Sequence, residues 1–199
     1  MNLLAIDTAT EACSVALSGT GDTILERFQI ESRGHSNLVL TMTEDVLWEA
    51  GISRHDLDGI AFDSGPGSFT GIRIGLGVAQ GLALALDLPL LGVSSLMALA
   101  EGSGVNAVLP AIDARMGEVY WGCFAARAGL PEALASEQVC PPEAVTLPAG
   151  PERWCGAGPG WQYRSAMPAE VSGRVDPVDE TLVLRAAWVA RLAVIAFGQ

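Results

Sequence analysis

The sequence contains no lysine, and all 11 of its basic residues are arginine. A phosphate-binding loop that grips a nucleotide with a lysine is therefore excluded, and so is an enzyme that forms a Schiff base on a lysine amine. With 23 acidic residues the net charge is −12, which argues against a chain that holds a nucleic-acid backbone alone, because such binding is mainly electrostatic. A genomic preference for arginine is the simpler explanation of the missing lysine, so the absence of lysine excludes mechanisms without identifying one.

Metal-ligand patterns are missing too. The four cysteines form no C-x-x-C pair, and the only histidines are His35 and His55. Zinc sites need closely spaced cysteine and histidine ligands, so we expect no metal centre and free thiols in a cytoplasmic protein.

The sequence also lacks a convincing membrane segment. Its first residues carry no basic start of the kind that marks a signal peptide. The most apolar region, residues 74–100, is interrupted by Asp87 and Pro89, and each half is shorter than the ~20 residues that span a bilayer. We expect no membrane association.

Charge is scarce: charged residues make up 17% of the chain, compared with about 25% in typical proteins. A surface with few charges favours a permanent partner that covers part of it. The 199 residues suffice for one domain or two small lobes, at roughly 100–200 residues per domain.

The pattern of apolar residues predicts an α/β protein. Three strands are expected at residues 3–8, 13–18 and 23–30, and the short turns between them (residues 19–22 in the second case) favour antiparallel pairing. Helical spacing follows at residues 37–50, after a candidate N-cap at Ser36, and again at residues 70–86. Further strands are expected at residues 57–62 and 88–93.

A short repeat indicates two lobes. Ala5-Ile6-Asp7 recurs as Ala111-Ile112-Asp113, and a turn and a second strand follow each copy, the later strand at residues 118–125. We therefore expect lobes at residues 1–101 and 102–199, with a cleft between them. The proline-rich residues 129–173 predict long loops and short strands, and residues 181–197 a final helix.

This arrangement resembles the actin-like ATPase and sugar kinase superfamily, with its RNase H-like lobes of mixed sheet and helices. In active members each lobe offers an aspartate on a glycine-rich turn to a nucleotide phosphate or its metal. Here the turns after Asp7 and Asp113 lack glycine where backbone N–H groups would have to approach a phosphate. Binding of nucleotide by Asp7, Thr8 and Asp113 remains one alternative.

A glycine-rich loop precedes the helix at residues 70–86. Gly65, Gly67 and Ser68 lie between a strand end and that helix, where first-turn N–H groups could bind an anion. A purely structural turn is the simpler interpretation, with Ser68 or Thr70 as the helix cap.

The helix itself contains Gly71, Gly75, Gly77 and Gly81. Each interior glycine costs about 1 kcal/mol relative to alanine, so the four need a reason. Either a partner helix approaches closely or the helix is buried within its own fold, and the sequence leaves both explanations open.

Three stretches together resemble the TsaB (YeaZ) family. They are residues 3–14, the Gly-Pro-Gly-Ser-Phe-Thr-Gly-Ile-Arg-Ile-Gly run at 65–75, and the Ala-Ile-Asp-Ala-Arg-Met-Gly-Glu-Val-Tyr-Trp run at 111–121. The resemblance implies a non-catalytic scaffold of the bacterial complex that installs threonylcarbamoyl on the adenosine beside the anticodon of tRNAs reading ANN codons. It also implies binding to the catalytic paralogue TsaD and, through it, to the ATPase TsaE, and a homodimer when TsaD is absent. Contact with tRNA would be indirect or shared, and ATP and magnesium would be present only within the complex.

In this family the first two helices pack with those of the partner in a four-helix bundle. The candidate interface residues on these helices are Leu38, Met42, Thr70, Gly71, Ile74, Gly75, Gly77, Val78 and Gly81.

The same resemblance argues against catalysis. TsaD carries a metal-binding His-x-x-x-His, and here Ser95 and Leu99 stand at the corresponding positions. A hydroxyl and an isobutyl group cannot replace two imidazole ligands, so we expect no metal and no catalytic residues. The rivals are a nucleotide-dependent kinase or hydrolase that uses Asp7 and Asp113, and a metallopeptidase, for which ligands are lacking. The family usually continues beyond the final helix into a Pro-x-Tyr-Leu-Arg-type tail; the sequence stops at Gln199 without one, so that tail is either absent or lies outside it.

Several single residues carry weaker expectations. We expect His35 to lie in an exposed loop, His55 in a solvated turn and Cys13 in the core, with Tyr120 or Trp121 available to an interface. Residues 154–160 form a second glycine-rich turn, which by resemblance could retain part of an adenosine pocket.

Overall fold

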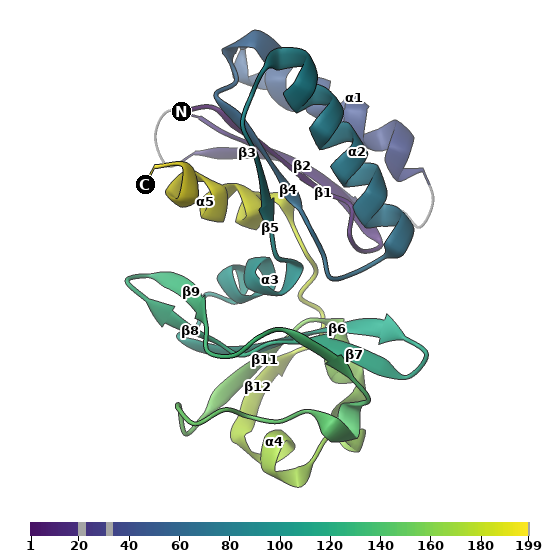
Figure 1. Ribbon diagram of the computed structural model, residues 1–199, viewed down its shortest axis with the longest axis vertical. Coiled ribbons are helices and arrows are strands. Elements are labelled where there is room, and N and C mark those ends of the chain that lie inside the picture. Colours follow the sequence, from purple (N-terminus) through teal and green to yellow (C-terminus); the bar gives the residue numbers. More distant parts are fainter. Residues whose placement is uncertain (20–22, 31–33, 199) are drawn as a thin grey trace. The chain divides into compact units, whose positions relative to one another are not determined.

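The computed structural model describes residues 1–19, 23–30 and 34–198. The chain divides into two compact units, Met1–Ser95 with Leu184–Gln199, and Leu96–Val183 (Figure 1). The mixed α/β class predicted from the sequence is confirmed, since each unit contains a sheet with both parallel and antiparallel strands.

The first unit is built on a five-stranded sheet of order β3-β2-β1-β4-β5. Its strands are β1 (Leu3–Asp7), β2 (Ala12–Ser18), β3 (Ile24–Ile30), β4 (Gly59–Asp63) and β5 (Leu90–Val93). The first three pair antiparallel, as their short turns predict, and β1, β4 and β5 run parallel. Part of the second turn, residues 20–22, lies outside the described residues. Every residue of β1 and β2 is buried, so both faces of the sheet are covered there.

Helices cover the two faces of this sheet. Helices α1 (His35–Ala50) and α2 (Phe69–Leu86) pack side by side on one face, and α5 (Ala186–Phe197) packs on the other (Figure 1). A short 3-10 turn, Arg54–Asp56, follows α1 and contains the exposed His55, as expected.

The second unit holds a seven-stranded sheet with the central order β10-β7-β6-β11-β12, in which β8 pairs with β6 and β9. Its strands are β6 (Ala107–Arg115), β7 (Glu118–Trp121), β8 (Phe124–Arg127), β9 (Leu130–Ala133), β10 (Gln138–Cys140), β11 (Trp154–Ala157) and β12 (Val175–Asp179). Its helical segments are α3 (Ser95–Ser103), which begins at the end of the first unit, α4 (Ala169–Arg174), and the 3-10 helices Pro142–Ala144 and Pro159–Ala166. The short strands between residues 129 and 173 agree with the proline-rich pattern there.

The boundary expected at residues 101–102 differs from the observed division. The final helix packs on β1, β2 and β4, so the end of the chain belongs to the first unit. It also begins at Ala186, later than the predicted residue 181. The reason is local: Asp179 accepts hydrogen bonds from the N–H and the hydroxyl of Thr181, which fixes a turn where a helix was expected.

Three local predictions were also wrong. Helix α1 is preceded by Gly34 in the left-handed region, with no side-chain cap from Ser36. His35 therefore lies in the first turn of the helix and is buried, with 8% of its surface exposed. The strand expected at residues 118–125 is two strands, because the buried pair Gly122 and Cys123 interrupts it.

Helix α2 is long and apolar enough to cross a membrane by length and composition alone, which the interruption at Asp87 did not lead us to expect. Only 22% of it is buried. The buried residues form one row of small side chains that packs on the sheet: Gly71, Gly75, Ala79 and Ala83.

Candidate functional site

Helix α2 begins in close contact with the end of β1. The hydroxyl of Thr8 donates to the Gly71 carbonyl at 2.7 Å, and the Ser68 N–H donates to the Ala9 carbonyl at 2.7 Å. Ser68, one of the two candidate caps, is the N-cap, and its hydroxyl accepts the Gly71 N–H at 3.2 Å. Thr8, Gly67 and Ser68 are therefore brought together, and the N–H groups of Ser68 and Gly71 bind atoms of the chain itself. Through these contacts the loop serves as a structural turn.

Two glycines of α2 are explained by this contact. A Cβ at Gly71 would lie 2.0 Å from the Thr8 carbonyl oxygen, and one at Gly75 would lie 2.6 Å from the Thr8 hydroxyl oxygen. In the preceding loop, a Cβ at Gly67 would lie 2.4 Å from the Ala9 carbonyl oxygen. These three positions need glycine so that the helix can approach its own sheet.

The other two glycines of α2 face away from the sheet. Gly77 and Gly81 are exposed, and nothing lies within 4 Å of a Cβ built at either position. Their four-residue spacing places them on one side of the helix. The sequence left two explanations open, burial within the fold or the approach of a partner helix. Burial explains Gly71 and Gly75, whereas Gly77 and Gly81 have no packing role within the fold.

Large apolar side chains are exposed on the same two helices. Trp48 and Leu40 on α1 are 84% and 51% exposed, and Leu84 and Phe69 on α2 are 87% and 71% exposed. We call these six residues the α1–α2 surface: Leu40, Trp48, Phe69, Gly77, Gly81 and Leu84.

The predicted interface residues fall into three groups. Thr70, Gly77 and Gly81 are exposed; Leu38, Ile74 and Val78 are half-buried against the core of the unit; and Met42, Gly71 and Gly75 are buried. The last three are unavailable to a partner in this fold, because they fill contacts inside the unit. Sequence reasoning missed Leu40, Trp48, Phe69 and Leu84. The missed signal was their position outside the core stripe of each helix.

Two buried aspartates end neighbouring parallel strands. Ile6 of β1 lies opposite Phe62 of β4, so Asp7 and Asp63 follow side by side, with 0% and 2% of their surfaces exposed. Burial raises the pKa of Asp7 to about 6, and burial together with the charge of Asp7 raises the pKa of Asp63 well above its ordinary range. Sequence reasoning paired Asp7 with Asp113 and missed Asp63, which the parallel pairing of β1 and β4 brings beside it.

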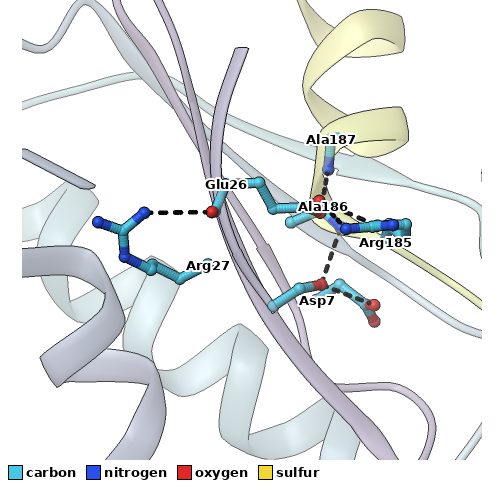
Figure 2. A network of polar contacts seen from close by, with 7 residues as sticks. Asp7, Glu26, Arg27, Arg185, Ala186 and Ala187 are labelled. Atoms are coloured by element: carbon cyan, nitrogen blue, oxygen red, sulfur yellow. Dashed lines mark hydrogen bonds and ion pairs between the residues drawn. The ribbon is translucent and has the colours of Figure 1, made fainter. Parts of the chain in front are cut away.

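Asp7 also connects to the start of α5. Its Oδ2 accepts the hydroxyl of Ser14, and the Ser14 oxygen accepts the Ala186 N–H at 2.8 Å (Figure 2). Glu26 of β3 accepts the Ala187 N–H. The Glu26 carboxylate also binds two nitrogens of the Arg185 guanidinium, at 2.9 Å and 2.7 Å. These side chains bind the first free N–H groups of α5 and fasten the end of the chain to the first unit.

Asp113 lies in the second unit, near the end of β6 and just before the turn to β7. Its Oδ1 accepts the Arg115 N–H at 2.8 Å and the Tyr163 hydroxyl at 3.4 Å, and its carboxylate pairs with the Arg115 guanidinium. Arg115 and Met116 have φ values of 69° and 55°, and glycine appears only at Gly117. Local contacts of the turn thus engage the carboxylate. On β7, which pairs with β6, Trp121 is buried at 3% exposure and Tyr120 is half-buried, so of the two residues expected at an interface only Tyr120 is partly accessible.

The second glycine turn is explained by packing as well. A Cβ at Gly156 would lie 2.6 Å from the Trp161 ring, and Cβ atoms at Gly158 and Gly160 would lie 2.6 Å and 2.7 Å from the backbone of Ala111. These glycines allow close packing within the second unit, and the space beside them is filled by protein.

Ser95 and Leu99, which stand where TsaD has its metal-binding histidines, have structural roles in this fold. The Ser95 hydroxyl donates to Asp63, and Ser95 and Leu99 are both fully buried. In the described part of the chain, no group of three histidine, cysteine, aspartate or glutamate side chains could hold a metal ion.

Comparisons with known proteins agree with one another. The family model for TsaD, tRNA N6-adenosine threonylcarbamoyltransferase, matches residues 29–169. The Escherichia coli protein named tRNA threonylcarbamoyladenosine biosynthesis protein TsaB is 47% identical over 169 residues, which cover 81% of this chain and 73% of that protein. The Haemophilus influenzae protein of the same name is 39% identical over 173 residues, with the same two coverages.

A solved structure extends the likeness to the fold. YeaZ from Pseudomonas aeruginosa superposes with a TM-score of 0.93 at 45% identity, and the match covers 99% of this chain and 92% of that one. A likeness at this identity and coverage concerns the whole chain. The chain therefore belongs to the TsaB (YeaZ) family, whose named members are tRNA threonylcarbamoyladenosine biosynthesis proteins.

Proposed function

We propose that this chain is a non-catalytic subunit of the complex that makes threonylcarbamoyladenosine in tRNA, and that it acts by pairing with the catalytic subunit TsaD through the α1–α2 surface. The observation that carries the proposal is the exposed apolar face of α2, with Gly77 and Gly81 open to the surroundings. Small residues let two helices approach closely, and exposed apolar patches mark interaction sites. TsaE would join through TsaD, and the same surface would support a homodimer when TsaD is absent.

The magnitude of exposure supports a permanent partner. Trp48 and Leu84 leave more than four-fifths of their surfaces in water at 84% and 87%. Burying a large apolar side chain is worth about 1.5–3 kcal/mol, so covering the two contributes substantially to association. A partner helix laid over Gly77 and Gly81 would contact both helices, since α1 and α2 are neighbours.

A non-catalytic role is supported by the chemistry of the buried residues. Ser95 and Leu99 offer no imidazole at the positions of the TsaD ligands, and Ser95 already hydrogen-bonds Asp63. Association without catalysis therefore accounts for more of the structure than a kinase or hydrolase does.

The charges support a division of labour with respect to tRNA. Several arginines are paired with acidic side chains of the chain itself: Arg27 with Glu49, Arg54 with Glu44, Arg127 with Glu132, and Arg185 with Glu26. An acidic chain whose cations are so engaged offers little to a phosphate backbone, so the partner would supply most of the phosphate contacts.

Reconstitution tests the function. Purified TsaD, TsaE and the enzyme that supplies threonylcarbamoyl-adenylate are mixed with tRNA, with or without this chain, and the nucleosides are analysed. We expect threonylcarbamoyladenosine only when the chain is present. Equal yields in both mixtures would refute the proposed role.

A further inference from the structure

The ends of β1 and β4 bring two carboxyl groups together inside the first unit. Asp7 and Asp63 are 0% and 2% exposed, and they follow strand positions that pair directly. Two adjacent carboxylates without compensation would repel each other strongly in such an environment, because water cannot screen their charges.

Hydrogen bonds account for three of the four carboxyl oxygens. Asp7 Oδ1 accepts the Ala9 N–H at 2.9 Å, and its Oδ2 accepts the Ser14 hydroxyl at 3.3 Å. Asp63 Oδ1 accepts the Gly65 N–H at 2.8 Å and the Ser95 hydroxyl at 2.5 Å. Asp63 Oδ2 is buried and has no partner among these groups. An unsatisfied buried carboxylate oxygen is costly, so this atom requires an explanation.

The charged groups near the two aspartates do not explain the unsatisfied Asp63 Oδ2. Glu26 on β3 adds negative charge near Asp7, and the Arg185 guanidinium beside it is engaged by Glu26 itself. The charge of His35, at the start of α1, lowers the pKa of Asp7, and the buried thiol of Cys13 on β2 is neutral because burial and Asp7 raise its pKa to about 11. The ion pairs of Arg27, Arg54, Arg127, Arg174 and Arg185 are formed with other carboxylates.

We propose that Asp7 and Asp63 share one proton at neutral pH, which resides on Asp63 Oδ2 and is donated in a hydrogen bond to the Asp7 carboxylate. The proton turns the unsatisfied acceptor into a donor, leaves one negative charge where there would be two, and makes a strong charge-assisted hydrogen bond. The raised pKa values of both groups support this assignment, with Asp63 as the protonated member.

The two aspartates lie next to the segments that contact the N-terminal end of α2. Asp7 is followed by Thr8 and Ala9, which hydrogen-bond the start of that helix, and Asp63 leads into the loop that ends at its N-cap, Ser68. A shared proton therefore joins the two strand ends on which the anchorage of α2 depends. Loss of that proton would create a second, unsatisfied negative charge at the ends of β1 and β4.

Carbon-13 NMR of the intact chain tests the assignment without mutation. At pH 7 the Asp63 carboxyl carbon should have the chemical shift of a protonated acid, and that of Asp7 the shift of a carboxylate. Carboxylate shifts for both groups at pH 7 would overturn the proposal. Adding magnesium should leave both signals in place; movement of the Asp63 signal to the carboxylate position would show that a cation, rather than a proton, belongs between them.

A variant distinguishes a proton shared between Asp7 and Asp63 from a proton that burial of Asp63 alone retains. In Asp7→Asn the neighbouring charge is removed, so the titration midpoint of Asp63 should fall by at least one pH unit. An unchanged midpoint would mean that burial alone holds the proton, and the shared-proton assignment would be wrong. Asp45→Asn, an exposed substitution on α1, is the matched control and should leave the Asp63 titration unchanged.

Discussion

At the scale of single residues, identical amino acids in α2 have opposite roles. Gly71 lies against the carbonyl of Thr8, where no Cβ fits, whereas Gly81 faces open space. The fold needs the first glycine and gains nothing from the second. A glycine that lowers helix stability without serving the fold is consistent with a role in association.

Alanine substitutions at these two positions should therefore change stability in opposite directions. Gly71→Ala should lower the free energy of unfolding by about 1–3 kcal/mol through overpacking. Gly81→Ala should raise it by about 0.5–1 kcal/mol, because alanine favours the helix. Denaturant unfolding of both variants measures this, and a similar loss at both positions would contradict the separation of roles.

The buried acid pair makes stability depend on pH. The folded-state pKa of Asp7 is about 6, above its ordinary value of 3.8, so its protonated form stabilises the fold. That contribution is fully present below about pH 4 and is lost as pH rises through about 6. Asp63 acts in the same direction, since burial and the charge of Asp7 raise its pKa well above the ordinary range.

Asp63→Asn should reduce this dependence. The amide keeps an acceptor for Gly65 and Ser95 and gives Asp7 a permanent N–H donor, so the variant should gain stability relative to the wild type as pH is raised from 6 to 9. Thermal unfolding across that range measures the difference. If the wild type and the variant follow parallel curves, residue 63 does not titrate in this interval.

At the scale of secondary-structure elements, α5 depends on residues far away in the sequence. The N–H groups of Ala186 and Ala187 bind Ser14 on β2 and Glu26 on β3, so the first turn of the helix is completed by the sheet. The same glutamate binds Arg185, whose guanidinium also lies 4.6 Å from the Phe28 ring centroid. The final helix is therefore fixed at its start by the first unit.

Removing this anchor should loosen α5 selectively. Glu26→Ala should cost about 1.5–3 kcal/mol, the usual worth of hydrogen bonds to a charged group. Hydrogen exchange of the α5 amides should accelerate more than that of β1. Glu49→Ala, which removes a partly exposed ion pair with Arg27, is the control and should cost about 0–1 kcal/mol. Equal protection of α5 in the two variants would contradict the anchoring role.

The elements of the first unit were largely predictable from the sequence, because each follows from its own periodicity. Helix α2 was expected at residues 70–86 and observed at Phe69–Leu86, and its cap, Ser68, was one of the two candidates. The assignment of α5 to the first unit was not predictable, since it depends on contacts between Glu26 and Ala187, 161 positions apart. The start of α5 was missed for a local reason, the turn made by Asp179 and Thr181.

The candidate site was predictable only in part. Glycine spacing indicated the correct helix but could not show which glycines face the sheet, because Gly71 and Gly77 look alike until the approach of Thr8 is known. Trp48 was overlooked because one tryptophan outside a core stripe is not a pattern. The partner of Asp7 could not be identified before the parallel pairing of β1 with β4 was known.

At the scale of the whole molecule, the features that would bind a nucleotide are engaged in internal contacts. The Asp7 carboxylate accepts N–H and hydroxyl groups of its own unit, and Asp113 is held by its turn. Calorimetric titration of the isolated chain with Mg-ATP should therefore give no binding heat. Tight binding that is lost in Asp113→Asn would instead favour the kinase or hydrolase alternative.

The proposed pairing with TsaD depends most on the exposed face of α2, and one binding measurement tests it directly. Purified chain is titrated calorimetrically against TsaD as the wild type, as Gly81→Leu, and as the control Gly173→Leu, which fills equally open space on α4 of the second unit. We predict that the wild type and the control bind alike and that Gly81→Leu, while still folded, binds at least tenfold more weakly. Undiminished affinity of Gly81→Leu for TsaD would contradict the proposal that the chain acts through the α1–α2 surface.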